Sequence, residues 1–153
     1  MNLRRAIAVV AVTGLGTAFS GVVAEAADRP KLTISCSKAG FTGSVAIYGR
    51  SGPNGFGGTA PLADITKVQY KIKKPNGGRT ERNDVFVHYR PDLEQPELRY
   101  RVAKSGDKAL ADNKWHSLRL ESDSTKTKHP DFLVEFIFNT PDKDPRCTNH
   151  KRL

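Results

Sequence analysis

Basic side chains alternate with apolar ones along several short segments of this chain, and its single tryptophan stands beside one of them. In a β-strand successive side chains point to opposite faces, so the apolar members would face a core and the basic members solvent. Cations grouped around an aromatic ring can hold an anionic polymer, because the cations bind phosphate or carboxylate and the ring stacks on a sugar or base. The residues predicted to form such a binding face are Lys71, Arg99, Arg101, Trp115 and Arg119, with Lys67 and Lys73 in the same phase as Lys71.

Residues of the kinds used in catalysis do not fall into a recognisable catalytic motif. The glycine-rich stretch 52–59 has the outline of a phosphate-binding loop, but Gly58 occupies the position of the essential lysine. Ser51 is followed by Gly52 and Pro53, so it does not sit in a nucleophile elbow. The four histidines show no metal-ligand spacing, and neither a metal ion nor another cofactor is expected.

Two histidines and one glutamate lie within the apolar alternation. His116 shares a phase with leucines and is expected at the edge of the core, bonded to a backbone group, whereas His88 is expected on an outer face. Glu135 stands inside a strongly apolar segment, and we expect a covered central strand in which it pairs with a neighbouring Lys or Arg. Alternatively, Leu133 and Ile137, which share its phase, form an exposed patch for a partner.

The chain has two cysteines, Cys36 and Cys147, which are 111 positions apart. In an oxidising compartment two lone cysteines in a small domain are expected to pair. Neither lies in a CxxC motif, and His150 alone does not complete a metal site with Cys147. We therefore predict a disulfide that closes almost the whole domain into one loop.

The N-terminus has the layout of a secretory signal peptide over residues 1–26. Two arginines precede an apolar run, and Ala24 and Ala26 provide the small residues needed for cleavage near position 26. Residues 27–153 are expected to form one secreted, extracellular domain with no membrane span. Since the signal contains two basic residues and one acidic residue, the remaining 23 basic and 15 acidic residues carry a formal charge of +8. Such an excess suits an anionic partner.

Apolar residues recur with a period of two in seven short segments, which is typical of strands with one buried face. An all-β fold is predicted: an antiparallel β-sandwich, Ig-like or jelly-roll-like, with about seven strands and one disulfide. Residues 107–112 are the only expected helical turn, and 49–64 is expected to be a surface loop. The strands are expected near 32–36, 45–48, 67–73, 85–89, 98–102, 115–120 and 132–138. The predicted core contains Val68, Tyr70, Ile72, Leu98, Tyr100, Val102, Leu118, Leu120, Val134, Phe136 and Phe138.

Segment 98–121 combines Leu98-Arg-Tyr-Arg-Val, Ser105-Gly-Asp and Asp112-Asn-Lys-Trp-His-Ser-Leu-Arg-Leu-Glu. It resembles the DGxWHxV strand of laminin-G and concanavalin-like jelly rolls, with Asn113 in place of the usual glycine. The likeness covers about 24 residues and implies a local strand and turn, without ligand residues.

Three classes of function are compatible with these features. A non-enzymatic binding module ranks first, with its basic face turned to an anionic cell-wall polymer, an acidic glycan, extracellular nucleic acid or another secreted protein. An inhibitor of an extracellular enzyme such as a protease ranks second, with the 49–64 loop as its contact. A secreted hydrolase ranks third, because no base, nucleophile and oxyanion donor assemble from local motifs.

Overall fold

The computed structural model describes residues 29–53, 57–77, 80–91, 98–121 and 131–153. These residues form strands joined by turns, and no helical segment among them has the length and apolarity needed to span a bilayer. The signal peptide predicted for residues 1–26 lies outside the described residues. The ten strands are β1 (Leu32–Lys38), β2 (Phe41–Pro53), β3 (Thr59–Lys73), β4 (Thr80–Arg90), β5 (Tyr100–Lys104), β6 (Ala109–Ala111), β7 (His116–Ser117), β8 (Arg119–Leu120), β9 (Asp131–Ile137) and β10 (Arg146–Arg152).

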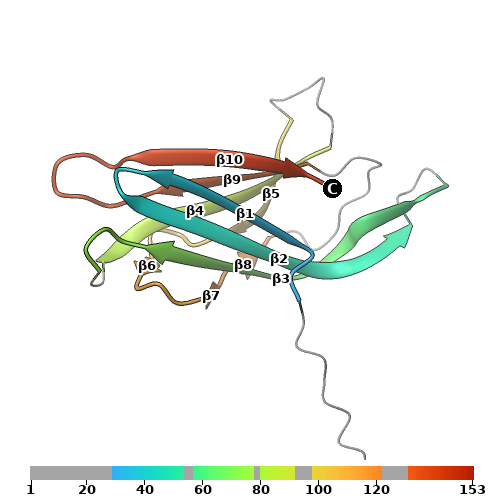
Figure 1. Cartoon of the computed structure of the whole chain (residues 1–153). Coiled ribbons are helices and arrows are strands. Elements are labelled where there is room, and N and C mark those ends of the chain that lie inside the picture. The colour runs from blue at the N-terminus through green and yellow to red at the C-terminus, as the bar shows by residue number, and fades with distance from the viewer. Residues whose placement is uncertain (1–28, 54–56, 78–79, 92–97, 122–130) are drawn as a thin grey trace, which may run out of the picture.

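The strands form two antiparallel sheets that pack face to face (Figure 1). The four-stranded sheet has the order β1-β2-β3-β7, and the six-stranded sheet has the order β10-β9-β4-β5-β8 with β6 paired to β4. Apolar side chains from the inner faces of both sheets form one continuous core. The predicted all-β antiparallel sandwich with one disulfide is therefore confirmed, with ten strands rather than seven.

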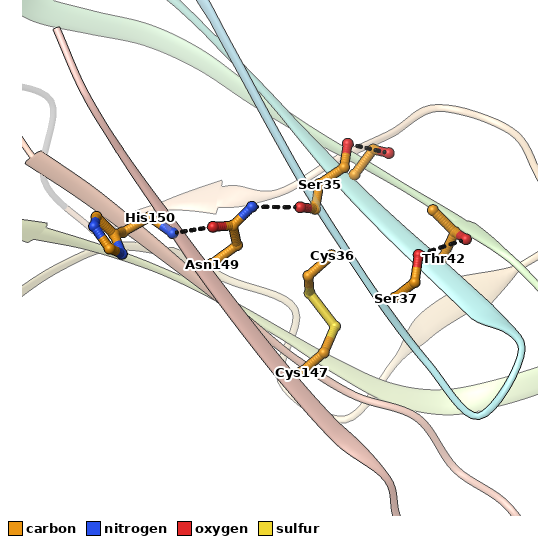
Figure 2. The surroundings of a disulfide bond; sticks show 8 residues. Ser35, Cys36, Ser37, Thr42, Cys147, Asn149 and His150 are labelled. Carbon is orange, nitrogen blue, oxygen red and sulfur yellow. Dashed lines mark hydrogen bonds between the residues drawn. A yellow bond between two sulfur atoms is a disulfide. The ribbon is translucent and has the colours of Figure 1, made fainter.

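The two sheets are joined covalently at both of their edges. At one edge the Cys36–Cys147 disulfide links β1 to β10 across a Cα–Cα distance of 6.0 Å, and the side-chain amide of Asn149 donates to the carbonyl of Ser35 at 2.7 Å (Figure 2). At the other edge the chain passes from β7 in one sheet to β8 in the other through the buried Leu118. The predicted disulfide is thus confirmed, and it joins the edge strands of opposite sheets.

The two sheets pack tightly where an aromatic ring of one sheet meets a glycine of the other. Gly43 on β2 faces Phe136 on β9, and a Cβ atom built on Gly43 would lie 2.5 Å from the ring. The fully buried ring of Phe136 occupies this space and neighbours Phe138, which stacks on Phe41 with ring centroids 4.8 Å apart. The separation of the sheets at this point is set by an aromatic ring lying directly on backbone.

Two segments expected to be irregular are strands. Residues 107–112, expected as a helical turn, contain β6, which the side-chain amide of Asn83 supports by donating to the Ala109 carbonyl at 2.8 Å. The stretch 49–64, expected as a loop, is largely the paired outer part of the β2–β3 hairpin, which extends to the right in Figure 1. Register shifts bend this hairpin, and at Gly49 the backbone oxygen of Asp64 would lie 2.1 Å from any Cβ. The many glycines of this stretch therefore permit bulges.

Two members of the predicted core lie on the surface. Leu98 is 37% exposed and Tyr100 is 52% exposed, whereas Leu120 is half-buried against the core and the other eight are buried. A register shift in the β4–β5 pair interrupts the strict alternation, so that Val102 and Ala103 are both buried. Beyond this bulge Tyr100 stacks on the ring of Tyr89 at a centroid distance of 6.5 Å, at the margin of the core.

Reduction of the disulfide is expected to destabilise the domain by about 4–5 kcal/mol, because the bond closes a very long loop and so restricts the unfolded chain. The protein denatured without reductant should contain no titratable thiol, since Cys36 and Cys147 are the only cysteines. Denaturant titrations with and without reductant measure the difference. One or two free thiols in the unreduced protein would contradict the pairing.

Gly43→Ala is expected to destabilise the fold by about 1–3 kcal/mol, because the added methyl group overlaps the ring of Phe136. Phe136→Leu removes part of that overlap, so the double variant should lose less stability than the sum of the two single variants. Urea denaturation of all four proteins tests this coupling. Strict additivity would show that the two residues do not share one packing constraint.

Candidate binding face

The outer face of the four-stranded sheet carries a row of lysines along β3. Lys67, Gln69, Lys71 and Lys73 point outward, because the residues between them face the core and are buried. A strand rises about 3.4 Å per residue, so the Cα atoms of Lys71 and Lys73 are about 7 Å apart. The period-two pattern of this strand therefore places several cations on one side, as predicted.

Acidic residues are nearly absent from this sheet. Its strands β1, β2, β3 and β7 contain one, Asp64, which lies in the outer part of the hairpin beyond the first register shift. Within the described part of the chain no ion pair involves Lys67, Lys71 or Lys73. Their positive charges are therefore not neutralised by neighbouring carboxylates. We call this surface, made of the outward residues of β1, β2, β3 and the Trp115 turn, the lysine face.

Aromatic rings accompany two of these lysines. The ammonium group of Lys67 lies 4.1 Å from the ring centroid of Tyr48, and that of Lys71 lies 4.9 Å from the ring centroid of Trp115. Trp115 is 42% exposed, whereas Tyr48 is buried beneath its lysine. Cation–π contacts of this kind hold the lysines close to the sheet while leaving their charge available.

A hydrogen-bonded turn fixes the position of Trp115. The carboxylate of Asp112 accepts hydrogen bonds from the Lys114 amide at 3.0 Å and from Nε2 of His116 at 2.8 Å. The amide of Asn113, whose φ is 60°, donates to the Ile72 carbonyl of β3 at 2.9 Å. Asparagine tolerates this left-handed conformation, which glycine adopts most readily. The turn therefore docks on β3 and presents the indole beside Lys71.

The carboxyl group of Asp112 is stabilised in its ionised form, in which it accepts these two hydrogen bonds. Burial alone would raise its pKa, but the hydrogen bonds from His116 and the Lys114 amide outweigh burial and lower the pKa below its ordinary value of 3.8. His116 was expected to bond a backbone group, and this expectation is wrong: it binds Asp112 and stacks on Tyr70 at 5.3 Å. The role of Asp112 in this turn was not predicted from the sequence; the signal that could have shown it is an Asp two residues before the amide from which its carboxylate accepts a hydrogen bond.

Several cations of the six-stranded sheet are paired with carboxylates. Lys104 and Arg101 contact Glu121 at 2.7 and 3.7 Å, and the hydrogen bond from Lys104 lowers the pKa of Glu121. Arg146 pairs with Glu135 at 2.9 Å, which confirms the expected partner of that glutamate. Carboxylates thus balance Arg101, Lys104 and Arg146 on this sheet, whereas no ion pair among the described residues balances the lysines of β3.

His88 lies half-buried on the outer face of the six-stranded sheet, as expected. Burial, and after it the charge of Arg101, lower its pKa below the ordinary histidine value. On the same strand Arg90 pairs with the buried carboxylate of Asp131. Burial also raises the pKa of Tyr89, an inward neighbour, to about 12. The Arg90–Asp131 pair and the ring contact of Tyr89 with Phe132 hold β4 against β9.

The five predicted site residues do not share one face. Lys71 and Trp115 are together on the lysine face, whereas Arg101 and Arg119 belong to β5 and β8 of the other sheet, and the exposed Arg99 precedes β5. Alternation along a strand states which side chains point outward, but it does not state which sheet the strand joins. Lys73, with the same phase as Lys71, and Asp112, which was not singled out, complete the site.

A hollow of about 450 Å³ opens at one end of the lysine face. It is lined by two lysines, one carboxylate, an asparagine pair and the residues of two turns: Gly40, Lys73, Lys74, Pro75, Asn76, Gly77, Asp112 and Asn113. The described residues of this lining offer cations, amides and the carboxylate of Asp112, and none of them is a hydroxyl or thiol nucleophile. Within the described residues no group of three metal-ligating side chains is found either.

Comparison of the chain with models of known protein families, with curated proteins and with solved structures finds no match. What the lysine face can bind therefore has to follow from its own residues.

The intensity or wavelength of tryptophan fluorescence is expected to change when Asp112 is protonated, because Trp115 is the only tryptophan. The pKa of Asp112 is lowered in the folded protein, so its hydrogen bonds are present above pH 3.8 and are lost as the pH falls through the lower, folded value. In Asp112→Asn this acid step should be missing. Far-UV circular dichroism at each pH controls for unfolding, and an identical step in the variant would contradict the assignment.

Proposed function

We propose that this protein is a secreted, non-enzymatic binding module that holds an extracellular polyanion on its lysine face. The observation that carries the proposal is the row of lysines on β3, which have no carboxylate partners among the described residues, whereas Arg101, Lys104 and Arg146 of the other sheet do. A paired cation has little attraction left for a ligand, while an unpaired row adds its potentials. The polymer would lie along β3.

Charge spacing supports a polymer rather than a single small anion. The row from Lys67 to Lys73 spans about 20 Å along the strand, and successive cations are within about one to two Debye lengths at physiological salt. Their potentials therefore add over a strip and not at one point. The sheet beneath them is rigid, since its inner side is part of the core. Retention should be salt-sensitive, as for other polyelectrolyte contacts.

Two other functions, an enzyme inhibitor and a hydrolase, would give different experimental results. An inhibitor would use the outer part of the β2–β3 hairpin, where Arg50 is exposed on a strand rather than on a loop. A hydrolase would need a nucleophile near the Asp112–His116 pair. Loss of a protease's activity at equal stoichiometry would support the inhibitor, and turnover of a substrate would support the hydrolase.

Lys71→Glu combined with Lys73→Glu is expected to lower the affinity for an anionic polymer by about one hundredfold at low salt, since two attractions become two repulsions. The melting temperature should change little, because exposed charges contribute little to stability. Binding is measured by retention on an immobilised polyanion during a salt gradient.

The matched control is Arg119→Glu combined with Arg152→Glu. Both arginines are exposed on the six-stranded sheet, and the change in net charge is the same. If the control variant is displaced at the same salt concentration as the lysine variant, net charge alone governs retention and the lysine face has no special role.

A further inference from the structure

Small hydroxyl side chains cover the part of the lysine face that lies beside the lysines. Ser35 and Ser37 point outward from β1, on the side of the strand opposite to Cys36 (Figure 2), and Thr42 and Ser44 point outward from β2. The strand register places Ser35 opposite Ser44 and Ser44 opposite Lys71, and it places Ser37 opposite Thr42 and Thr42 opposite Lys73. Each of these two rows therefore runs from hydroxyls to an ammonium group.

The hydroxyls are held in pairs that retain bonding capacity. Ser35 and Ser44 are hydrogen-bonded at 2.8 Å, and Ser37 and Thr42 at 2.9 Å. Two hydroxyls together have two donors and four lone pairs, and one mutual bond leaves a donor and three lone pairs available. Both pairs are solvent-exposed, so this remaining capacity faces the ligand side. The pairing also fixes the oxygens, which reduces the entropy lost on binding.

The row at Lys71 continues to an aromatic ring. Neighbouring strands are about 4.8 Å apart, so hydroxyl, ammonium and indole succeed one another over about 10 Å between Ser44 and the turn that carries Trp115. A sugar acid presents the three matching features: hydroxyl groups, an anionic group and an apolar ring face. A polypeptide acid or an inorganic polyphosphate lacks the first and the last.

A single-stranded nucleic acid fits this surface less well. Binding of successive bases uses several stacking aromatic side chains. Among the described residues of the lysine face, Trp115 is the one exposed large aromatic, since Tyr48 is covered by Lys67. One exposed indole, with hydroxyl pairs beside the lysines, suits sugar rings better than a run of bases.

Building on the proposed function, we infer that the ligand of the lysine face is an acidic polysaccharide. Its carboxylate or sulfate groups contact Lys71 and Lys73, its hydroxyl groups bind the two hydroxyl pairs, and one sugar ring stacks on Trp115. The lysines then supply attraction to any polyanion, and the hydroxyl pairs supply the preference for a glycan.

The test compares polygalacturonate with poly-L-glutamate of similar length, because both carry carboxylates but the peptide has no sugar hydroxyls. The wild-type protein is expected to bind polygalacturonate at least about tenfold more tightly, a difference that one or two hydrogen bonds can supply. Thr42→Val combined with Ser44→Val should abolish this preference, because the affinity for polygalacturonate falls by about tenfold more than the affinity for poly-L-glutamate. Valine retains the strand preference, and Thr148→Val on the exposed side of β10 is the control, with the preference intact.

The outcomes separate the two proposals. Equal binding of both polymers by the wild type, or tighter binding of single-stranded DNA or polyphosphate, would overturn the glycan assignment and leave the polyanion function standing. Failure to bind any of the four polymers would overturn both. An unchanged glycan preference in the Thr42/Ser44 variant would also overturn the role of the hydroxyl pairs.

Discussion

The bond between Cys36 and Cys147 is the constraint on which this sandwich depends most. Strand β10 has one buried residue, Cys147 itself, and its other side chains are polar and exposed. Such a strand gains little from burial, so its backbone pairing with β9, the disulfide and the Asn149–Ser35 hydrogen bond hold it at the edge. With β10 in place, β9 becomes an inner strand and presents Phe136 to Gly43. The tight contact between Phe136 and Gly43 thus lies one strand away from the covalent link at the border of the sandwich.

Alternation of apolar residues predicts strands well where one side is buried, and β3, β4 and β9 confirm this. The same pattern is uninformative for β10, whose stability comes from a disulfide rather than from an apolar face. It is also uninformative for β6, a three-residue strand held by the amide of Asn83. These elements depend on contacts between distant parts of the chain, which a local pattern does not contain.

For the binding face, too, the local pattern predicts the direction of a side chain but not the sheet to which its strand belongs. The outward phase of Lys71 follows from its own strand, and the exposure of Trp115 follows from its turn. The assignment of Arg101 and Arg119 to the other sheet could not be predicted, because sheet membership is decided by pairing between strands. Neither could their electrostatic setting, since Arg101 shares Glu121 with Lys104 only after folding. Two sets of cations that look alike in the sequence thus acquire different surroundings.

The link between the first and the last strand also decides how the protein would bear force. A pull on the two ends of the described chain passes through β1 as far as Cys36, crosses the sulfur–sulfur bond, and leaves along β10 from Cys147. The chain between the two cysteines, a sequence separation of 111 residues, carries none of this tension. The lysine row and the Trp115 turn lie in this part of the chain. Only the outer parts of the two edge strands can peel. A protein held on a polymer while its ends are dragged would therefore keep the lysine row and the Trp115 turn at their resting shape until a covalent bond breaks, whereas Ser35 could separate from Ser44 with the outer part of β1.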